Sequence, residues 1–282
     1  MGPNIDRNRV EELVRSALAG LAASNAGNRP TLLDGAGAVL LPPEASGGQA
    51  YDADTQRALV AATPARVAVG RSGTRYRTAT LLRFRADHAA ARDAVMSDVD
   101  KALVERLGLV ELASQATSKR HFLERPDAGR ALAPASRELL TSRCARAPQI
   151  QLCYGDGLSA AAINAHLESF HGALVAAIGK RGLRVGTSVF VRYSRVKVMD
   201  EIARLLQAEA CVFACGERPG LGFADSLSAY YIYRPGEGAT DANREVTSNI
   251  NPRGLAPPQA AEVVAEQLQR ILEQRRSGVV MG

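Results

Sequence analysis

The chain has 282 residues, 46% of them hydrophobic, and a formal net charge of +6. This length allows one large domain or two small ones, and the apolar content is sufficient for a buried core. The charge would suit a nucleic-acid-binding protein, but the arginines are scattered, aromatic residues make up only 5% and no nucleic-acid motif is found. No apolar run is long enough to span a bilayer, so we expect a globular protein that contacts neither nucleic acid nor a membrane.

The first patterned segment is residues 6–21, where apolar side chains recur at helical spacing. We predict an amphipathic helix within residues 1–22, followed by a flexible linker over residues 23–60 that is rich in Ala, Gly and Pro. Because such a helix has no core of its own, its apolar face is expected to pack either on its own domain or on another protein. That face consists of Val10, Leu13, Val14, Ala17, Leu18 and Leu21.

Residues 61–145 are predicted to form a smaller, mostly helical domain. A short strand is expected at residues 66–70, and a helix from Thr78 to about Val99. A short apolar run at residues 109–112 precedes two further helices, one around residues 121–123 and one over residues 134–143.

Residues 146–282 are predicted to form a second domain in which strands and helices alternate. Helices are expected to begin after Ser159, at Asp200 and at Pro257. Because this alternation is typical of βαβ units, we predict an α/β fold with a Rossmann-like parallel sheet. The predicted strands are residues 149–154, 187–193, 210–215 and 228–233.

The four cysteines are expected to be reduced and buried. Cys211 and Cys215 lie four residues apart in a predicted strand, which would separate them by roughly 13 Å, about twice the distance that a disulfide tolerates. No His or Cys lies nearby at the spacing of a zinc site, so no metal site is predicted.

Three loops follow predicted strands, at residues 155–159, 194–197 and 216–222. In a parallel sheet the C-terminal ends of the strands open on one edge, where α/β proteins usually bind their ligands. Glycines in these loops would allow the backbone to approach a ligand closely. We therefore predict that this edge is the binding site.

A nucleotide- or dinucleotide-binding oxidoreductase of the Rossmann type is the alternative to be considered. The segments 155–157 and 220–222 each begin the Gly-x-Gly-x-x-Gly fingerprint, but Ala160 and Asp225 occupy its last position. Neither segment is followed by a clear ribose-binding acid at the expected distance. Because alanine is sometimes tolerated at the last position, this alternative stays open.

The chain shows no local catalytic motif. None of the four histidines lies beside a nucleophile, and His166 and His171 are expected on the polar, exposed side of a helix. Glu217 and Arg218 are either an acid with its partner or an ion pair that fixes the loop. We therefore assign no catalytic residue to this chain.

The most distinctive segment runs from Ala210 to Gly254. It contains an apolar strand that ends in Gly216-Glu217-Arg218-Pro219-Gly220-Leu221-Gly222, and later the motif Thr247-Ser248-Asn249-Ile250. This segment resembles the small (light) subunit of ethanolamine ammonia-lyase. Similar segments occur in the same order between about residues 65 and 278: Thr78 to Ala91, Arg125-Pro126-Asp127, Asp156-Gly157-Leu158-Ser159, and Val191 to Tyr193 with Arg195-Val196-Lys197.

The resemblance implies a small subunit that helps bind adenosylcobalamin, in an enzyme that converts ethanolamine to acetaldehyde and ammonia by a radical mechanism. The cofactor would lie between this chain and the large subunit, which is the expected partner. The family's cobalamin-contact positions fall on Val196, Glu217 and Val246, the last of which is often cysteine in other members. No histidine lies in a cobalt-binding motif, which is consistent with a cofactor that keeps its own dimethylbenzimidazole as the lower ligand.

The resemblance also implies a location in the cell. Members of the family carry similar N-terminal helices that address the enzyme to a bacterial microcompartment. The N-terminal residues lack the apolar centre of a secretory signal. We therefore expect a cytoplasmic protein in the microcompartment lumen, with its N-terminal helix in contact with the shell or with other cargo.

Overall fold

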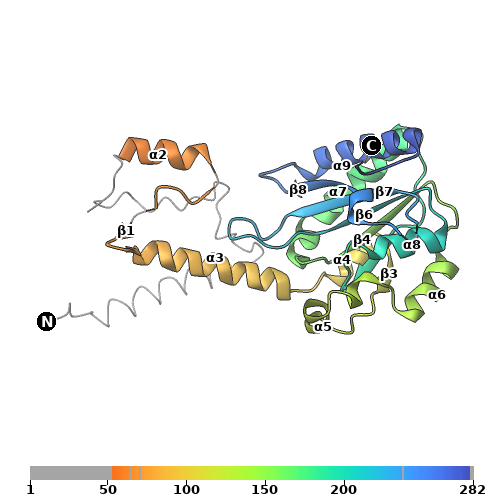
Figure 1. Cartoon of the computed structure of the whole chain (residues 1–282), viewed down its shortest axis with the longest axis horizontal. Coiled ribbons are helices and arrows are strands. Elements are labelled where there is room, and N and C mark those ends of the chain that lie inside the picture. The colour runs from red at the N-terminus through yellow and green to blue at the C-terminus, as the bar shows by residue number, and fades with distance from the viewer. Residues whose placement is uncertain (1–52, 64, 70, 237, 280–282) are drawn as a thin grey trace. The chain divides into compact units, whose positions relative to one another are not determined.

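The computed structural model describes residues 53–63, 65–69, 71–236 and 238–279 (Figure 1). The chain divides into two compact units, Met1–Arg83 and Phe84–Gly282. The predicted helix within residues 1–22, and the linker up to residue 52, lie outside the described residues. The last part of the predicted linker instead forms helix α2 (Ala53–Ala62), in an Ala-rich sequence that favours a helix.

In the described part of the first unit, α2 is followed by a two-stranded hairpin of β1 (Arg71–Ser72) and β2 (Arg75–Tyr76). Gly73, with a φ of +61°, occupies the turn, where a glycine avoids the cost of a left-handed backbone. The strand predicted at residues 66–70 is wrong, because residues 65–69 are irregular and Ala68 has a φ of 54°. The helix predicted from Thr78 is confirmed as α3 (Thr78–Met96), which crosses the boundary between the units.

The larger unit contains a six-stranded sheet and the helices that cover it. The helix that follows α3 in this unit, α4 (Lys101–Arg106), was not predicted, and Asp100 caps it by accepting a hydrogen bond from the backbone N–H of Ala102. Its elements in chain order are α4 (Lys101–Arg106), β3 (Val110–Ala113), α5 (Lys119–Glu124), η1 (Ala128–Arg130), α6 (Pro134–Arg143), β4 (Ile150–Gly155), α7 (Ala160–Lys180), β5 (Val189–Arg192), α8 (Val198–Leu206), β6 (Ala210–Gly216), β7 (Leu227–Tyr233), η2 (Asp241–Asn243), β8 (Glu245–Ile250) and α9 (Pro257–Gln274).

The sheet is mixed, with the strand order β3-β5-β4-β6-β7-β8. The predicted parallel pairing is confirmed for β5, β4 and β6 and is wrong for β7, which pairs antiparallel with β6. Strands β3, parallel to β5, and β8, antiparallel to β7, were not predicted. A parallel neighbour requires a crossover connection, usually a helix, but only the loop between Gly216 and Leu227 separates β6 from β7. The chain therefore returns beside β6 as a hairpin.

The predicted boundary between a helical domain and a sheet domain, at residues 145 and 146, lies inside the larger unit. Strand β3 comes from the segment predicted as helical, and it pairs with β5 over Val110–Ala113. A single strand of four residues between helices shows only a short alternating pattern. Such a pattern is too weak to predict that the strand joins a sheet whose other strands come later in the sequence. The pairing partner, from Val189 onward, lies far along the sequence.

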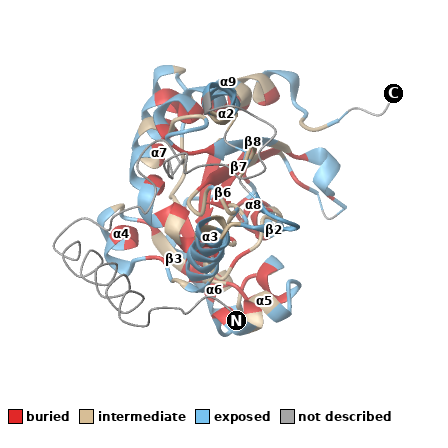
Figure 2. Cartoon of the chain, turned by 90° about the vertical axis from the view of Figure 1, so that its left-hand side faces the viewer, coloured by how far each residue is buried: buried red, intermediate tan, exposed pale blue. Residues whose placement is uncertain are grey.

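The core has two halves, one on each face of the sheet. Side chains of β6 alternate between them: Val212 packs in the cluster that includes α7 and α9, and Phe213 packs in the cluster that includes α8. Figure 1 accordingly shows α7 and α9 on one side of the sheet and α6 and α8 on the other. Figure 2 shows that buried residues follow the strands and the inward faces of these helices.

Helix α7 confirms one prediction and contradicts another. Ser159 is confirmed as its N-cap, since Oγ accepts a hydrogen bond from the backbone N–H of Ala162. The expectation that His166 and His171 are exposed is wrong. His166 is 8% exposed because the loop before β7 brings Asp225 beside it, and the ring of His171 lies 2.8 Å from the hydroxyl of Tyr154.

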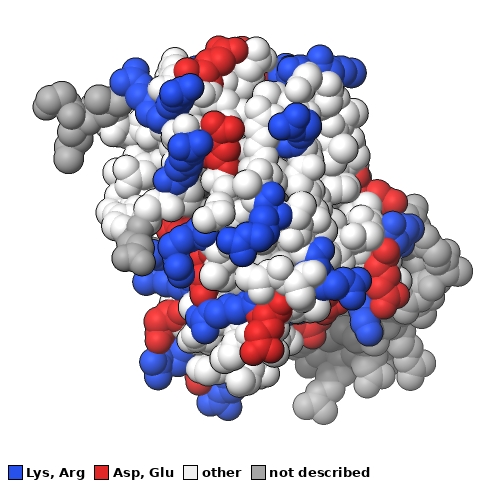
Figure 3. All heavy atoms as spheres, turned by 90° about the vertical axis from the view of Figure 1, so that its right-hand side faces the viewer, with Lys and Arg blue, Asp and Glu red and all other residues white. Residues whose placement is uncertain are grey.

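The remaining predictions concern Asp200, the four cysteines and the surface of the molecule. Helix α8 begins at Val198, so Asp200 lies in its first turn and does not cap it. All four cysteines are free and buried, as predicted. Among the described residues, no helix is sufficiently long and apolar to cross a membrane. On the face drawn in Figure 3, basic and acidic side chains are interspersed, so the positive net charge does not gather there as one patch.

Candidate functional site

After the C-terminal ends of β4 and β5, the chain continues in opposite directions across the sheet. From β4 the chain passes through α7 to its neighbour β5, whereas from β5 it passes through α8 to β6 on the other side of β4. Because α7 and α8 pack on opposite faces, the loops after β4 and β5 leave the sheet in opposite directions. Such a switch point is the usual ligand crevice of an α/β sheet.

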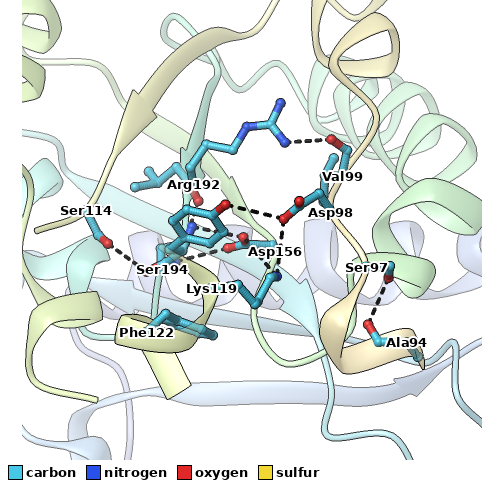
Figure 4. Close-up of polar contacts among 12 residues, drawn as sticks. Ala94, Ser97, Asp98, Val99, Ser114, Lys119, Phe122, Asp156, Arg192 and Ser194 are labelled. Atoms are coloured by element: carbon cyan, nitrogen blue, oxygen red, sulfur yellow. Dashed lines mark hydrogen bonds and ion pairs between the residues drawn. The ribbon is translucent and has the colours of Figure 1, made fainter. Parts of the chain in front are cut away.

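Asp156 lies at this switch point and ties the two loops together. Its carboxylate is buried, and Oδ2 accepts a hydrogen bond from the backbone N–H of Tyr193 at 2.9 Å, while Oδ1 accepts one from Ser194 at 3.0 Å (Figure 4). Tyr193 has a φ of 52°, a left-handed conformation that a non-glycine residue rarely adopts. The carboxylate thus stabilises an unfavourable turn.

Lys119 supplies the positive charge beside this buried carboxylate. Its Nζ lies 3.6 Å from Asp156 Oδ2 and 3.8 Å from Asp98 Oδ1, and it is held at 5.2 Å from the centroid of the Tyr193 ring. Burial raises the pKa of the Asp156 carboxyl, and this effect is opposed by Lys119 and by the N–H groups of Tyr193 and Ser194. A buried ion pair whose carboxylate also accepts two backbone hydrogen bonds fits a role in fixing the loops.

Sequence reasoning identified Asp156 as part of a motif but missed Lys119 and Asp98. The three residues lie far apart in the sequence, on the β4–α7 loop, on α5 and after α3. Lys119 is 9% exposed, which is unusual for a lysine. Ser118, which caps α5 by accepting from the backbone N–H of His121, was the one local signal of a helix start at this position.

Glu217 is the first residue after β6, and one of its carboxylate oxygens is fully engaged. Oε1 accepts hydrogen bonds from the Ser228 hydroxyl at 2.6 Å and from the backbone N–H of Asn249 at 2.7 Å. In the described part of the chain, Oε2 has no hydrogen bond and Glu217 forms no ion pair with Arg218. The suggested loop-fixing ion pair is therefore absent among these residues, and Glu217 anchors the loop through β7 and β8 instead.

The three predicted cofactor contacts occupy different places in this region. Val196 is half-buried in the loop before α8, packed against the core cluster on the α8 face. It shares the C-terminal edge of the parallel strands with Glu217. Val246 lies within the outer strand β8, opposite Tyr230, and its side chain is 50% exposed. Asn249, which binds Glu217, is the link between that carboxylate and β8.

A cavity of about 650 Å³ opens beside the end of β3. Arg192 is in its wall, with Nε donating to Glu111 Oε1 at 2.7 Å and Nη1 donating to the carbonyl of Val99 at 2.6 Å. The hydroxyl of Ser114, also in the wall, donates to the carbonyl of Tyr193, which connects this cavity to the Asp156 turn. Its charged pair, Arg192 and Glu111, is internally satisfied, and alanines and a proline contribute to the rest of its wall.

The glycines of the edge serve protein packing more than ligand approach, contrary to our expectation. A Cβ on Gly155 would lie 2.1 Å from the Ser194 hydroxyl, and one on Gly157 would lie 2.4 Å from the carbonyl of Gly216. At Gly216 it would lie 2.0 Å from the carbonyl of Ser159. Within the loop after β6, only Gly222 has open space around it in the described structure.

This packing does not support the dinucleotide-binding alternative. That fingerprint needs glycines that leave room for a pyrophosphate at the start of a helix. At the start of α7 the space is filled by the loop after β6, and the buried carboxylate of Asp156 would repel an anion.

Comparison with protein families agrees with the pattern of segments. The model of the family described as "Ethanolamine ammonia-lyase light chain (EutC)" matches residues 53–281. The match includes the larger unit up to residue 281, the described part of the first unit, and every residue discussed at the sheet edge. The light chain is one subunit of a carbon–nitrogen lyase that also has a large subunit. This chain therefore belongs to the ethanolamine ammonia-lyase light chain family.

Proposed function

We propose that this chain helps bind adenosylcobalamin, so that the complete enzyme converts ethanolamine to acetaldehyde and ammonia by a radical mechanism. The larger unit would act as a Rossmann-like cobalamin-contacting domain. Membership of the light chain family supports this role. The observation that carries it is the orientation of Glu217, which has one oxygen fixed by Ser228 and Asn249 and the other without a hydrogen bond in the described structure.

The chemistry of the three predicted contacts fits this cofactor. Cobalamin presents amide and hydroxyl donors around a flat corrin ring with apolar faces. Glu217 Oε2 can accept a hydrogen bond from a propionamide or from the ribose hydroxyl. Val196 and the exposed Val246 offer apolar surface for the corrin or the benzimidazole, and valine at position 246 cannot make a thiol-specific contact.

Once bound, the cofactor supplies the radical chemistry, and the residues of this chain bind and orient it. The loops that present Val196 and Glu217 are held rigidly, the first by Asp156 and the second by β7 and β8. No residue of this chain is assigned to proton transfer. Substrate would bind in the large subunit, on the other side of the cofactor.

The direct test is co-expression with the cognate large subunit, followed by measurement of ammonia release with and without adenosylcobalamin. The complex should be active only with the cofactor, and this chain alone should be inactive in both conditions. Production of acetaldehyde by the purified chain alone, with cofactor and ethanolamine, would show that the proposal is wrong.

Replacement of Glu217 should weaken cofactor binding without removing activity. Glu217→Gln keeps an acceptor oxygen and should reduce affinity only modestly. Glu217→Ala leaves donors unpaired and should cost about 1–3 kcal/mol, a factor of about 5–150 in affinity. Cobalamin titrations of the complex measure this loss, and turnover should recover at saturating cofactor in both variants. Turnover that stays low at saturation, with unchanged affinity, would assign Glu217 a part in the reaction.

We also propose that the N-terminal helix directs the enzyme into a bacterial microcompartment, in contact with the shell or with cargo. The amphipathic pattern of residues 6–21 and the long segment that follows it support this. Deletion of residues 1–22 should leave activity unchanged and abolish loading into compartments, which fractionation would measure. If the deletion instead removes the thermal unfolding transition, the helix is a part of the folded core.

A further inference from the structure

Three arginines from three separate loops carry positive charge at the C-terminal edge of the sheet, where two of them act electrostatically on the third. They are Arg130 at the end of η1, Arg195 in the loop after β5 and Arg218 in the loop after β6. The backbone N–H of Arg195 donates to the carbonyl of Gly129 at 2.7 Å, and a Cβ on Gly129 would lie 2.9 Å from Arg195 Cγ. Burial lowers the pKa of Arg195, and the charges of Arg130 and Arg218 lower it further.

Arg195 is under-satisfied in its present surroundings. Nη2 donates to the carbonyl of Phe122 at 3.3 Å and the guanidinium lies 4.3 Å from the centroid of the Phe122 ring. Its Nε is buried and has no hydrogen-bond acceptor. A buried N–H of a cation that has no acceptor is costly, because it has lost water and gained no hydrogen bond in exchange. Such a group is expected to meet an acceptor from outside the chain.

No carboxylate in the described part of the chain neutralises the three arginines. None of them takes part in an ion pair there. Asp156 is the carboxylate whose charge acts on Arg195, but it is already engaged by Lys119 and by two backbone N–H groups. Glu217, the neighbour of Arg218, directs Oε1 to Ser228 and Asn249. The arginines therefore form an uncompensated positive cluster.

We propose that Arg195, assisted by Arg130 and Arg218, binds the phosphodiester of the nucleotide loop of cobalamin. This inference rests on the proposed cofactor-binding role of the chain. Arg195 directly precedes Val196, and Arg218 directly follows Glu217, so the cluster lies beside two of the predicted cofactor contacts. The phosphodiester is the anionic group on the periphery of cobalamin, and the forked donors of a guanidinium match phosphate oxygens.

The test compares three ligands on the complex of both subunits: cobinamide, which lacks the phosphate, cobinamide phosphate, and cobalamin. Affinities are measured by equilibrium dialysis, which requires no turnover. Arg195→Met should lower the affinity for cobalamin and for cobinamide phosphate by about 10- to 100-fold, and leave the affinity for cobinamide unchanged. Arg195→Lys keeps the charge and should lose less. In the wild type, added salt should reduce the preference for the phosphate-bearing ligands.

Arg143→Met is the matched control, because Arg143 is exposed at the end of α6, ahead of the start of β4, and should leave all three affinities unchanged. An equal loss for all three ligands in Arg195→Met would overturn the inference and show that Arg195 supports the loop. Weaker association of the subunits without cofactor would overturn it in favour of an acidic surface on the large subunit. If the wild-type complex binds no cobalamin, the proposed function itself fails.

Discussion

Replacing Asp156 with alanine should lower the free energy of unfolding by about 3–5 kcal/mol. The change removes the acceptor of two backbone hydrogen bonds, from Tyr193 and Ser194, and leaves Lys119 buried without its nearest carboxylate. It also releases Tyr193 from a left-handed backbone conformation that the carboxylate holds in place. Urea unfolding of the full chain, followed by circular dichroism, measures the effect.

Three comparison variants separate the causes of this loss. Asp156→Asn keeps one acceptor and should be less damaging than Asp156→Ala. Adding Lys119→Met to Asp156→Ala should recover part of the loss, since the uncompensated buried charge is then gone. Asp127→Ala removes an exposed carboxylate that is paired with Arg125, and it should leave the unfolding midpoint nearly unchanged. A midpoint for Asp156→Ala equal to that of Asp127→Ala would contradict the structural role assigned here.

Much of the fold was predictable because local signals agreed with it. The helix over residues 134–143 begins with Pro134 at its first position, and α7 begins after the capping hydroxyl of Ser159. The apolar runs of β4 and β6 are buried on both faces, as central parallel strands require. In each of these places the sequence carries its own start or stop signal.

The strands that were missed depend on distant partners. Strand β8 has three exposed residues and a polar sequence, and only its pairing with β7 makes it a strand. Strand β3 similarly joins the sheet through β5. The antiparallel return of β7 was missed because its apolar sequence equally suits a parallel strand. Pairing of this kind is a tertiary property, and single-sequence patterns do not determine it.

The position of the three loops at one edge of the sheet was predictable, but the side-chain contacts among them were not. The loops at residues 155–159, 194–197 and 216–222 follow three parallel strands at one edge of the sheet, as the alternation of elements implied. The contacts among Asp98, Lys119 and Asp156 could not be read from the sequence, because no two of these residues belong to one motif. The roles of Val196, Glu217 and Val246 stay predictions that depend on family resemblance.

Gly216→Ala should destabilise the protein by about 3 kcal/mol or more, since a Cβ there would lie 2.0 Å from the carbonyl oxygen of Ser159. The obstructing atoms are backbone, so no side-chain rotation relieves the overlap. Ser159 cannot move freely either, because its hydroxyl caps α7 and donates to the carbonyl of Ala224 at 2.6 Å. For a protein of this size, the melting temperature should fall by about 6–12 °C.

Gly222→Ala is the matched control in the same loop. A Cβ at Gly222 meets no atom within 4 Å, so this variant should be as stable as the wild type or slightly more stable. Cofactor affinity should fall in Gly216→Ala and stay unchanged in Gly222→Ala. Displacement of Gly216 shifts the adjoining Glu217, whereas a change at Gly222 leaves the Glu217 carboxylate in place. Equal melting temperatures for the two variants would mean that the loops after β4 and β6 are not packed together. The proposal that Glu217 is held rigidly for contact with cobalamin would then lose its structural basis.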